Sequence, residues 1–325
     1  MKVVFMGTPD FAEVVAEAIV QAGHEIVLVV TQPDKPKGRG KEVQFPPMKQ
    51  WALAHDLPVF QPRKIREEEA IAHLQDYPAD IFIVAAFGQI LPKEILDMPS
   101  LGCVNVHASL LPKYRGAAPI QWAVINGDKV SGVTTMQMGV GLDDGDILQK
   151  QEVCLAADET GGSLFDRLAK VGGALCVQTM EALAAGTLTP IPQEEAQATH
   201  VGMIKKSMGE LDFHRSAVEL ERLIRGLDPW PSAYTRWGKR TLKVWKAKVW
   251  ETLPDSVSSP SDTSPGTVVM ATEEGIAVAT GEHFLVLQEV QLEGRKRMAV
   301  ADFLRGCSLE AGCRLGENLT VESEV

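Results

Sequence analysis

An amide and an imidazole stand two positions apart at the end of an apolar run. The stretch "GCVNVHAS" (102–109) has the pattern of a buried strand, in which alternate side chains share a face, so Asn105 and His107 project together. An amide N–H can stabilise a developing oxyanion, and an imidazole can do the same and move a proton. A histidine in a strand is more often a hydrogen-bonded core residue, so the spacing alone leaves both interpretations open.

Carboxylates lie further along the chain in a glycine-rich turn. The stretch "GVGLDDGDIL" (139–148) places Asp143, Asp144 and Asp146 between two strand-like runs. These acids lack the alternating positions of a calcium-binding loop, and a solvated acidic loop is the plain alternative. A carboxylate in this turn could return to the sheet end that carries His107.

The surrounding elements alternate between strands and helices. Apolar, β-branched runs predict strands at 3–8, 24–32, 80–88, 102–109, 130–138 and 146–153. The sequence between the first of these strands has apolar residues at helical spacing. Strands that are apolar on both faces indicate a Rossmann-like, mostly parallel sheet covered by helices on both sides. Asn105 and His107 then lie at the carboxyl end of a parallel strand, where open α/β sheets bind ligands. A long amphipathic helix is expected at 162–186.

The composition of the sequence changes after this helix. A polar stretch with two prolines predicts a linker at 188–207, and a short helix is expected at 216–226. Several short β runs with glycine turns follow, which is typical of a small OB-like β-barrel. We therefore expect an α/β domain at 1–187 and an OB-like domain at 208–325.

The first strand-to-helix turn argues against a nicotinamide enzyme. In "VVFMGTPDFA" the three glycine positions of the dinucleotide fingerprint hold Gly7, Pro9 and Ala12, so the backbone could not approach a pyrophosphate closely. We expect no NAD. A structural turn is the better interpretation, with Thr8 as the helix N-cap.

Composition excludes several further classes of protein. The 325 residues are 45% hydrophobic, and no apolar run approaches the roughly 18 residues of a membrane span. Five scattered cysteines without a C-x-x-C pair predict neither a metal site nor a disulfide framework. Met1 leads directly into a strand pattern, so a cytoplasmic protein is expected. The net charge of −11 means that any nucleic-acid contact must use local basic patches.

Longer blocks carry a family resemblance. The stretches "NVHASLLPKYRGAAPIQWAVINGD" and "GVTTMQMGVGLDDGDIL" resemble the folate-dependent formyltransferases, as do "MGTPDFA", "TQPDKPKGRGK", "AAFGQILP", "GLDPWPSAY" and "ADFLRG". The resemblance implies that 10-formyltetrahydrofolate is the formyl donor and that no metal is needed. It implies catalytic roles for Asn105, His107 and Asp143, and folate contacts from the segment Ser109, Leu110, Leu111 and Pro112.

The implied chemistry suits these residue types. When an amine attacks a formyl carbon, Asn105 can donate an N–H to the developing oxyanion, a contribution of about 3 kcal/mol in comparable sites. His107 can stabilise the same charge and carry the proton of the amine to the leaving nitrogen. Asp143 would orient the imidazole, directly or through water, and favour its charged form.

Two basic segments bear on which amine is formylated. The loop "QPDKPKGRGK" (32–41) contains Lys35, Lys37, Arg39 and Lys41. The segment "RWGKRTLKVWKAK" (236–248) has tryptophans between six cations, which are Arg236, Lys239, Arg240, Lys243, Lys246 and Lys248. In an acidic protein this pattern is typical of nucleic-acid backbone binding. With the resemblance, it predicts that a monomer formylates initiator methionyl-tRNA for translation initiation.

Other interpretations remain open from the sequence. The basic segment could be a solvated barrel face with core tryptophans, and strand alternation would allow Trp245 to be a core residue. A formyltransferase of a small amine, such as a nucleotide sugar or ribonucleotide, would not need this segment, and its activity would be indifferent to salt. A non-catalytic nucleic-acid-binding protein would have no use for the Asn-x-His pair.

Overall fold

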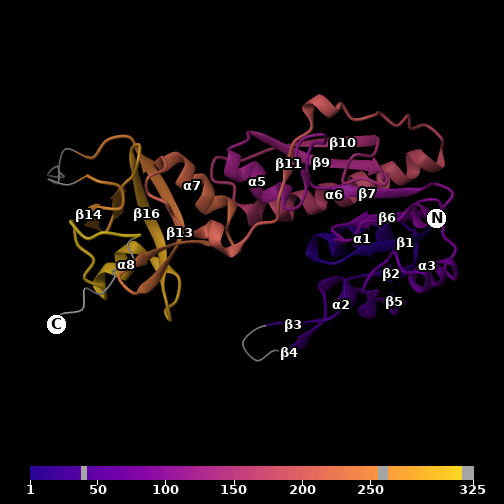
Figure 1. Cartoon of the computed structure of the whole chain (residues 1–325), viewed down its shortest axis with the longest axis horizontal. Helices are drawn as coiled ribbons and strands as arrows, with labels where there is room; N and C mark the ends of the chain where they lie inside the picture. Colours follow the sequence, from indigo (N-terminus) through magenta and orange to yellow (C-terminus); the bar gives the residue numbers. More distant parts are fainter. Residues whose placement is uncertain (38–41, 255–262, 317–325) are drawn as a thin grey trace. The chain divides into compact units, whose positions relative to one another are not determined.

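The chain forms two compact units (Figure 1). The computed structural model describes residues 1–37, 42–254 and 263–316. The first unit comprises residues 1–120, 129–155 and 163–202, and the second comprises 121–128, 156–162 and 203–325. Most of the stretch that reads as a linker, residues 188–202, therefore groups with the first unit.

The first unit is built on a seven-stranded sheet in the order β10-β9-β7-β6-β1-β2-β5. Neighbouring strands from β7 to β5 are parallel, whereas β9 runs antiparallel to both β7 and β10. The strands are β1 (Lys2–Gly7), β2 (Glu25–Val30), β5 (Val59–Phe60), β6 (Ile81–Ala85), β7 (Cys103–His107), β9 (Val130–Gln137) and β10 (Ile147–Cys154). The mostly parallel sheet that the sequence predicts is confirmed.

Helices cover both faces of this sheet (Figure 1). On one face, α6 (Gly161–Ala184) comes so close that a Cβ on Gly172 would lie 3.1 Å from Val106 Cγ1 and 3.3 Å from Phe11 Cζ of α1 (Asp10–Gln21). On the other face, residues of α3 (Glu68–Gln75) and α4 (Lys93–Leu96) share a buried cluster with side chains of β1, β2, β6 and β7. Helix α2 (Pro47–Ala54) packs beside α1.

The helices on the two faces of the sheet show which face carries Asn105 and His107. Cys103 belongs to the cluster beneath α3 and α4, whereas Val106 packs under α6. Because strand side chains alternate, Asn105 and His107 share the face of Cys103, further towards the carboxyl end of the strand. Asn105 sits beside Val84 in the parallel register with β6.

The turn after β1 is tightly packed and leaves no room for a side chain at Gly7. A Cβ on Gly7 would collide with Ala12 of α1 and lie 2.8 Å from the carbonyl oxygen of Ala85 in β6. The helix begins one residue later than the sequence indicates, with Pro9 at the N-cap, so the prediction of Thr8 as cap is wrong. The hydroxyl of Thr8 instead donates to the carbonyl of Phe87 and accepts from the backbone N–H of Gln32, each at 3.4 Å.

The second unit contains the smaller, OB-like antiparallel sheet. Its order is β12-β13-β16-β15-β14, with β17 paired to β16. The strands are β12 (Ala233–Trp237), β13 (Arg240–Trp250), β14 (Val268–Thr272), β15 (Gly275–Ala279), β16 (Phe284–Leu292) and β17 (Met298–Ala299). Two of its helices are α7 (Ala217–Gly226), which begins with a Ser216–Glu219 capping box, and α8 (Val300–Arg305); part of α5 (Pro119–Asn126) also groups here. No helix within the described ranges combines the length and the apolarity that a membrane crossing demands.

Candidate active site

The structure brings together the three residues that the sequence singles out for chemistry. Asn105 Nδ2 donates to Asp143 Oδ1 at 3.3 Å, and His107 Nδ1 lies 3.8 Å from Asp143 Oδ2. Asn105 and His107 are 8% and 7% exposed, so they are largely desolvated yet still reach the surface. A nearly dry site with a remaining opening is what oxyanion stabilisation requires.

The ring of His107 has a defined tautomer. Its Nε2 lies 2.9 Å from the carbonyl oxygen of Tyr114, which can only accept, so Nε2 carries a hydrogen. In the neutral imidazole the lone pair is therefore on Nδ1, the atom that faces Asp143. The Nδ1–Oδ2 distance of 3.8 Å is longer than a hydrogen bond, so the carboxylate acts on the ring through its charge. Tyr114, rather than Asp143, fixes the tautomer.

Asp143 and its neighbour Asp144 point in different directions. Asp143 has a backbone φ of +51°, which an aspartate tolerates better than most residues, and its Oδ2 accepts the backbone N–H of Gly116 at 2.8 Å. Asp144 folds back over its own loop, where a Cβ on Gly141 would collide with its carboxylate. Of the two acids, only Asp143 faces the imidazole.

The loop that carries Asp143 folds back along β7. Because β9 is antiparallel to β7, this loop (138–146) starts beside the amino end of β7, where the N–H of Met138 donates to the carbonyl of Cys103 at 2.8 Å. Its base is closed by a 2.8 Å hydrogen bond from the N–H of Gln137 to the carbonyl of Asp146. The loop thus returns the Asp143 carboxylate to the level of Asn105.

Sequence reasoning misses the groups that hold this cluster. Tyr114 and Gly116 act through backbone atoms, and no side-chain pattern could reveal that role. Their segment is paired with the stretch that reads as a linker, through parallel strands β8 (Arg115–Gly116) and β11 (His200–Val201). Gln193 of that stretch donates to the carbonyl oxygens of Asp143 and Gly145.

The segment from Ser109 to Pro112 forms a buried turn beside β9. Ser109 is 1% exposed, and its hydroxyl donates to the carbonyl of Lys113 at 2.7 Å. The N–H of Leu111 donates to Thr134 Oγ1 at 3.1 Å, and the Leu111 side chain packs in a buried cluster with Met136 and Ile147. The structure therefore gives Ser109 and Leu111 a supporting role in the floor of the site.

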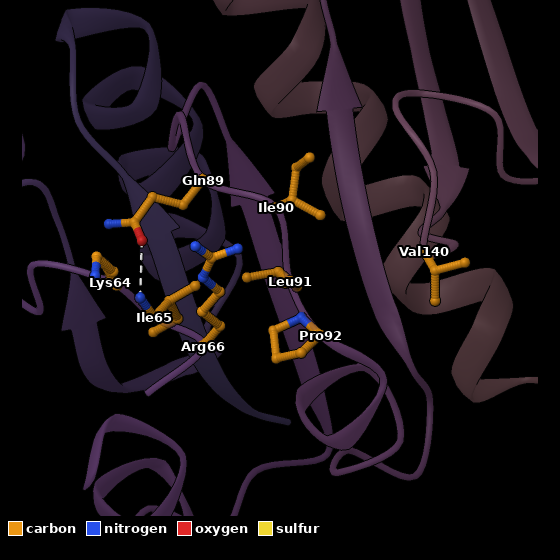
Figure 2. Close-up of a pocket in the computed structure, with 8 residues that line it drawn as sticks. All are labelled: Lys64, Ile65, Arg66, Gln89, Ile90, Leu91, Pro92 and Val140. Carbon is orange, nitrogen blue, oxygen red and sulfur yellow. Dashed lines mark hydrogen bonds between the residues drawn. The ribbon is translucent and has the colours of Figure 1, made fainter. Parts of the chain in front are cut away.

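A cavity of about 480 Å³ shares the 138–146 loop with Asp143 (Figure 2). Gln89 links two of its walls, because its Oε1 accepts the N–H of Ile65 at 2.8 Å. The cavity combines an apolar wall with two cations, and its lining residues are Lys64, Ile65, Arg66, Gln89, Ile90, Leu91, Pro92 and Val140. Such a lining suits a flat, partly apolar ligand with negative charges.

The first basic segment forms part of a β ribbon. Strands β3 (Lys35–Lys37) and β4 (Glu42–Gln44) pair antiparallel, and Lys35 is exposed. The predicted contacts Arg39 and Lys41 lie outside the described residues. The one acid of the loop is Asp34, and its carboxylate is paired with the Lys49 ammonium. Hydrogen bonds from Gln61 and from Lys49, at 2.7 and 2.6 Å, lower the pKa of Asp34.

The second basic segment covers the end of β12, the turn after it and most of β13 in the second unit. Leu242 and Val244 of β13 are buried, so the alternate residues Lys243 and Trp245 face outward, and the interpretation of Trp245 as a core residue is wrong. The cations stack over aromatic rings, with Arg240 over Trp237 at 4.8 Å, Lys248 over Trp250 at 5.0 Å, and both Lys243 and Arg297 over Trp245 at 5.4 and 4.9 Å. The other cations of the segment, Arg236, Lys239 and Lys246, are at least partly exposed.

Known proteins share both the sequence and the fold. Residues 1–180 match the formyl transferase family and residues 203–308 match the formyl transferase C-terminal domain. The methionyl-tRNA formyltransferase of Agathobacter rectalis is 57% identical over 96% of this chain and 98% of its own length, and that of Lachnospira eligens is 55% identical over 98% of this chain and 100% of its own.

Two solved structures support the fold alone. HypX from Aquifex aeolicus in complex with tetrahydrofolic acid has a TM-score of 0.62 and 14% identity, over 94% of this chain and 47% of its own. WlaRD, a sugar 3N-formyltransferase in the presence of dTDP and 5-N-formyl-THF, has a TM-score of 0.63 and 16% identity, over 91% of this chain and 99% of its own. With matches to both family domains and relatives of more than half identity along nearly the whole length, this chain belongs to the formyl transferase family.

Proposed function

We propose that this chain transfers the formyl group of 10-formyltetrahydrofolate to the amino group of methionine on initiator methionyl-tRNA, for translation initiation. The observation that carries the proposal is the desolvated Asn105–His107–Asp143 cluster in a chain whose relatives of 57% and 55% identity are named methionyl-tRNA formyltransferases. The donor supplies the formyl group, and the residues of the chain supply the hydrogen bonds and the proton transfers.

Asn105 is placed to stabilise charge on the formyl oxygen. Its Nδ2 has two hydrogens, and the bond to Asp143 uses one of them at 3.3 Å. The second can be donated to the formyl oxygen as negative charge develops there. One such donor in a dry site contributes about 3 kcal/mol to the transition state.

His107 Nδ1 is the proton carrier. The hydrogen bond from Nε2 to the carbonyl of Tyr114 leaves the Nδ1 lone pair free to take the proton of the attacking amine. Nδ1 then returns this proton to the departing folate nitrogen. The Asp143 carboxylate, 3.8 Å from Nδ1, stabilises the imidazolium between these two transfers.

The cavity beside this cluster suits the donor. Its wall of Ile65, Ile90 and Leu91 can cover a flat ring system, and Lys64 and Arg66 match the carboxylates at the other end of a folate. Leu110 and Pro112, the partly exposed residues of the turn after β7, complete the folate contacts, and the buried Ser109 and Leu111 support them from below. This part of the proposal assigns the donor to the α/β domain that the sequence predicts, residues 1–187.

The tRNA is held electrostatically by the second domain, residues 208–325. The outer face of β13 offers positive charge beside an aromatic ring, because Lys243 and Arg297 lie over Trp245, and this suits phosphates and unstacked bases and is tolerant of sequence. The 32–41 loop adds positive charge near the acceptor end of the tRNA. In this proposal the protein acts as a monomer in the cytoplasm.

The test is a formyl-transfer assay with 10-formyltetrahydrofolate and four acceptors at two salt concentrations. Initiator methionyl-tRNA should be formylated much faster than elongator methionyl-tRNA, glycinamide ribonucleotide or an amino sugar nucleotide. Transfer to the tRNA should weaken steeply with salt, because each neutralised phosphate releases counterions. Salt-independent transfer to either small acceptor, with none to tRNA, would replace this function with the small-amine alternative.

A further inference from the structure

The amide of Gln193 bridges two groups of opposite hydrogen-bonding character. Its Nε2 donates to the carbonyl oxygens of Asp143 and Gly145 at 2.9 and 2.7 Å. Its Oε1 accepts from Nε of Arg115 at 3.1 Å. The orientation of this amide is set by its partners, because carbonyls can only accept and a guanidinium can only donate.

The carbonyls that Gln193 holds lie on both sides of Asp144, in the loop that presents the catalytic carboxylate. Asp143 has a positive φ of +51°, which is unfavourable for a side-chain-bearing residue unless surrounding contacts hold it. Two hydrogen bonds from one rigid amide fix the carbonyl of Asp143 itself and that of Gly145, two residues further along the loop. The direction of the Asp143 carboxylate therefore depends on Gln193.

The segment around Gln193 holds the other half of the site as well. Thr199 accepts the N–H of Arg115 on its carbonyl at 2.8 Å and the N–H of Tyr114 on its hydroxyl at 2.8 Å. Ile191 exchanges two backbone hydrogen bonds with Ile147, of 2.8 and 2.9 Å. The stretch 191–201 thus holds two parts of the site through hydrogen bonds: the segment of Tyr114, whose carbonyl binds His107, and the loop that carries Asp143.

Gln193 is half-buried, unlike its neighbours, and it contacts a buried guanidinium. It is half-buried while Ile191, Pro192, Glu194 and Glu195 around it are exposed. Its partner Arg115 is 3% exposed and also donates to the carboxylate of Glu195 at 2.9 Å. A buried guanidinium fixed at its far end keeps Nε aimed at the Gln193 oxygen.

We propose that Gln193 is a positioning residue for the formyl-transfer reaction, which sets the distance between the Asp143 carboxylate and His107 Nδ1 through the backbone of the 143–145 loop. It does not touch the reacting atoms. This inference rests on the proposed function for the reaction that it serves, but its geometric content concerns the free protein.

The test compares two substitutions at Gln193 with the same substitutions at Gln197. Gln193→Met keeps the length and removes both donors, and Gln193→Glu keeps the shape but turns the donor into a charged acceptor. Gln197 is exposed on the same stretch and bonds to the Glu194 side chain, so Gln197→Met and Gln197→Glu are matched controls. We expect both Gln193 variants to lower kcat by 10- to 100-fold, with the KM for methionyl-tRNA within about twofold of wild type.

A measurement without substrates separates positioning from stability. The Hε1 resonance of His107 in the free protein should shift in both Gln193 variants and stay in place in both Gln197 variants. A wild-type kcat and an unmoved resonance in either folded Gln193 variant would overturn the inference. Loss of kcat in Gln193→Glu alone would also overturn it, because added charge and not lost donors would be the cause. If the wild-type protein formylates no methionyl-tRNA, the proposed function fails, and the resonance alone decides the role of Gln193.

Discussion

The candidate active site of the first unit and the outer face of β13 in the second unit use polar groups in opposite ways. In the active site, Asn105 and His107 are nearly buried and each has a hydrogen-bond partner at 2.9–3.3 Å. On the β13 face, Lys243 and Arg297 lie over the ring of Trp245 at about 5 Å, with their charges near solvent. The first arrangement depends on distances, and the second depends on the sum of its charges.

This difference determines what one substitution can do. A buried donor acts at full strength because water does not screen it, so its loss removes a large part of the transition-state stabilisation. A surface cation contributes one of several screened interactions, so its loss weakens binding by a modest factor and changes the salt dependence. The two regions should therefore separate into effects on kcat and effects on the KM for tRNA.

The largest effect should come from the catalytic pair. His107→Ala removes the proton carrier and Asn105→Ala removes the oxyanion donor, so each should lower kcat by about 10²- to 10³-fold. The KM for methionyl-tRNA should stay within about twofold, and circular dichroism should show a folded protein. His214→Ala, at an exposed histidine of the second unit, is the control and should turn over normally. Near-normal kcat in both active-site variants would remove their assigned roles.

The second largest effect should come from Asp143, and a comparison with Asp144 tests which acid serves His107. Asp143→Asn keeps the shape but removes the charge that faces His107 Nδ1, and kcat should fall by about 10- to 100-fold. Asp144→Asn is the matched control, because that carboxylate folds over Gly141, and kcat should change by less than about threefold. A larger loss in Asp144→Asn would show that the other acid serves the imidazole.

The parts of this site differ in how far the sequence predicts them. Asn105 and His107 share a face because a strand has a two-residue period, which is local information. The choice of Asp143 over Asp144 depends on one positive φ and on the space above Gly141, and the family resemblance supplied it. Gln193 escapes prediction because it meets Asp143 across 50 residues, from a polar stretch that has no periodicity.

Local rules fail where longer-range contacts compete for the same side chain. Thr8 has the type and position of an N-cap, but its hydroxyl bonds to Phe87 and Gln32, which follow other strands of the sheet. Trp245 is large and apolar enough for the core, but the neighbouring buried residues Leu242 and Val244 show that its strand places it on the outer face. Both errors concern the environment of one residue, whereas the strands that carry the site, β7 and β9, are where the sequence predicts them.

A smaller effect should come from the β13 face. Lys243→Gln removes one cation beside Trp245 and should raise the KM for methionyl-tRNA about threefold without changing kcat, while the slope of log KM against log salt falls by about one. Lys93→Gln is the control, because Lys93 is an exposed lysine of the first unit that is paired with Asp97 at 2.7 Å. An unchanged salt slope in Lys243→Gln would remove this face from the tRNA-binding surface.

The smallest effect on turnover should come from alkylating the cysteines, which contrasts the closed interior of the first unit with the surface cysteines of both units. Burial raises the pKa of the thiols of Cys103 and Cys176 to about 12, so at pH 8 only about one molecule in 10⁴ carries either thiolate. Iodoacetamide should therefore spare both residues in the folded protein and modify the exposed Cys154 and the half-exposed Cys307 and Cys313. Peptide mass spectrometry measures this pattern, with a urea-unfolded sample as the control in which all five cysteines react. Because Cys154, Cys307 and Cys313 lie outside both the catalytic cluster and the β13 face, kcat and the KM for tRNA should be unchanged. Rapid modification of Cys103 would show that the layer beneath α3 and α4, next to Asn105, opens to solvent in the native protein.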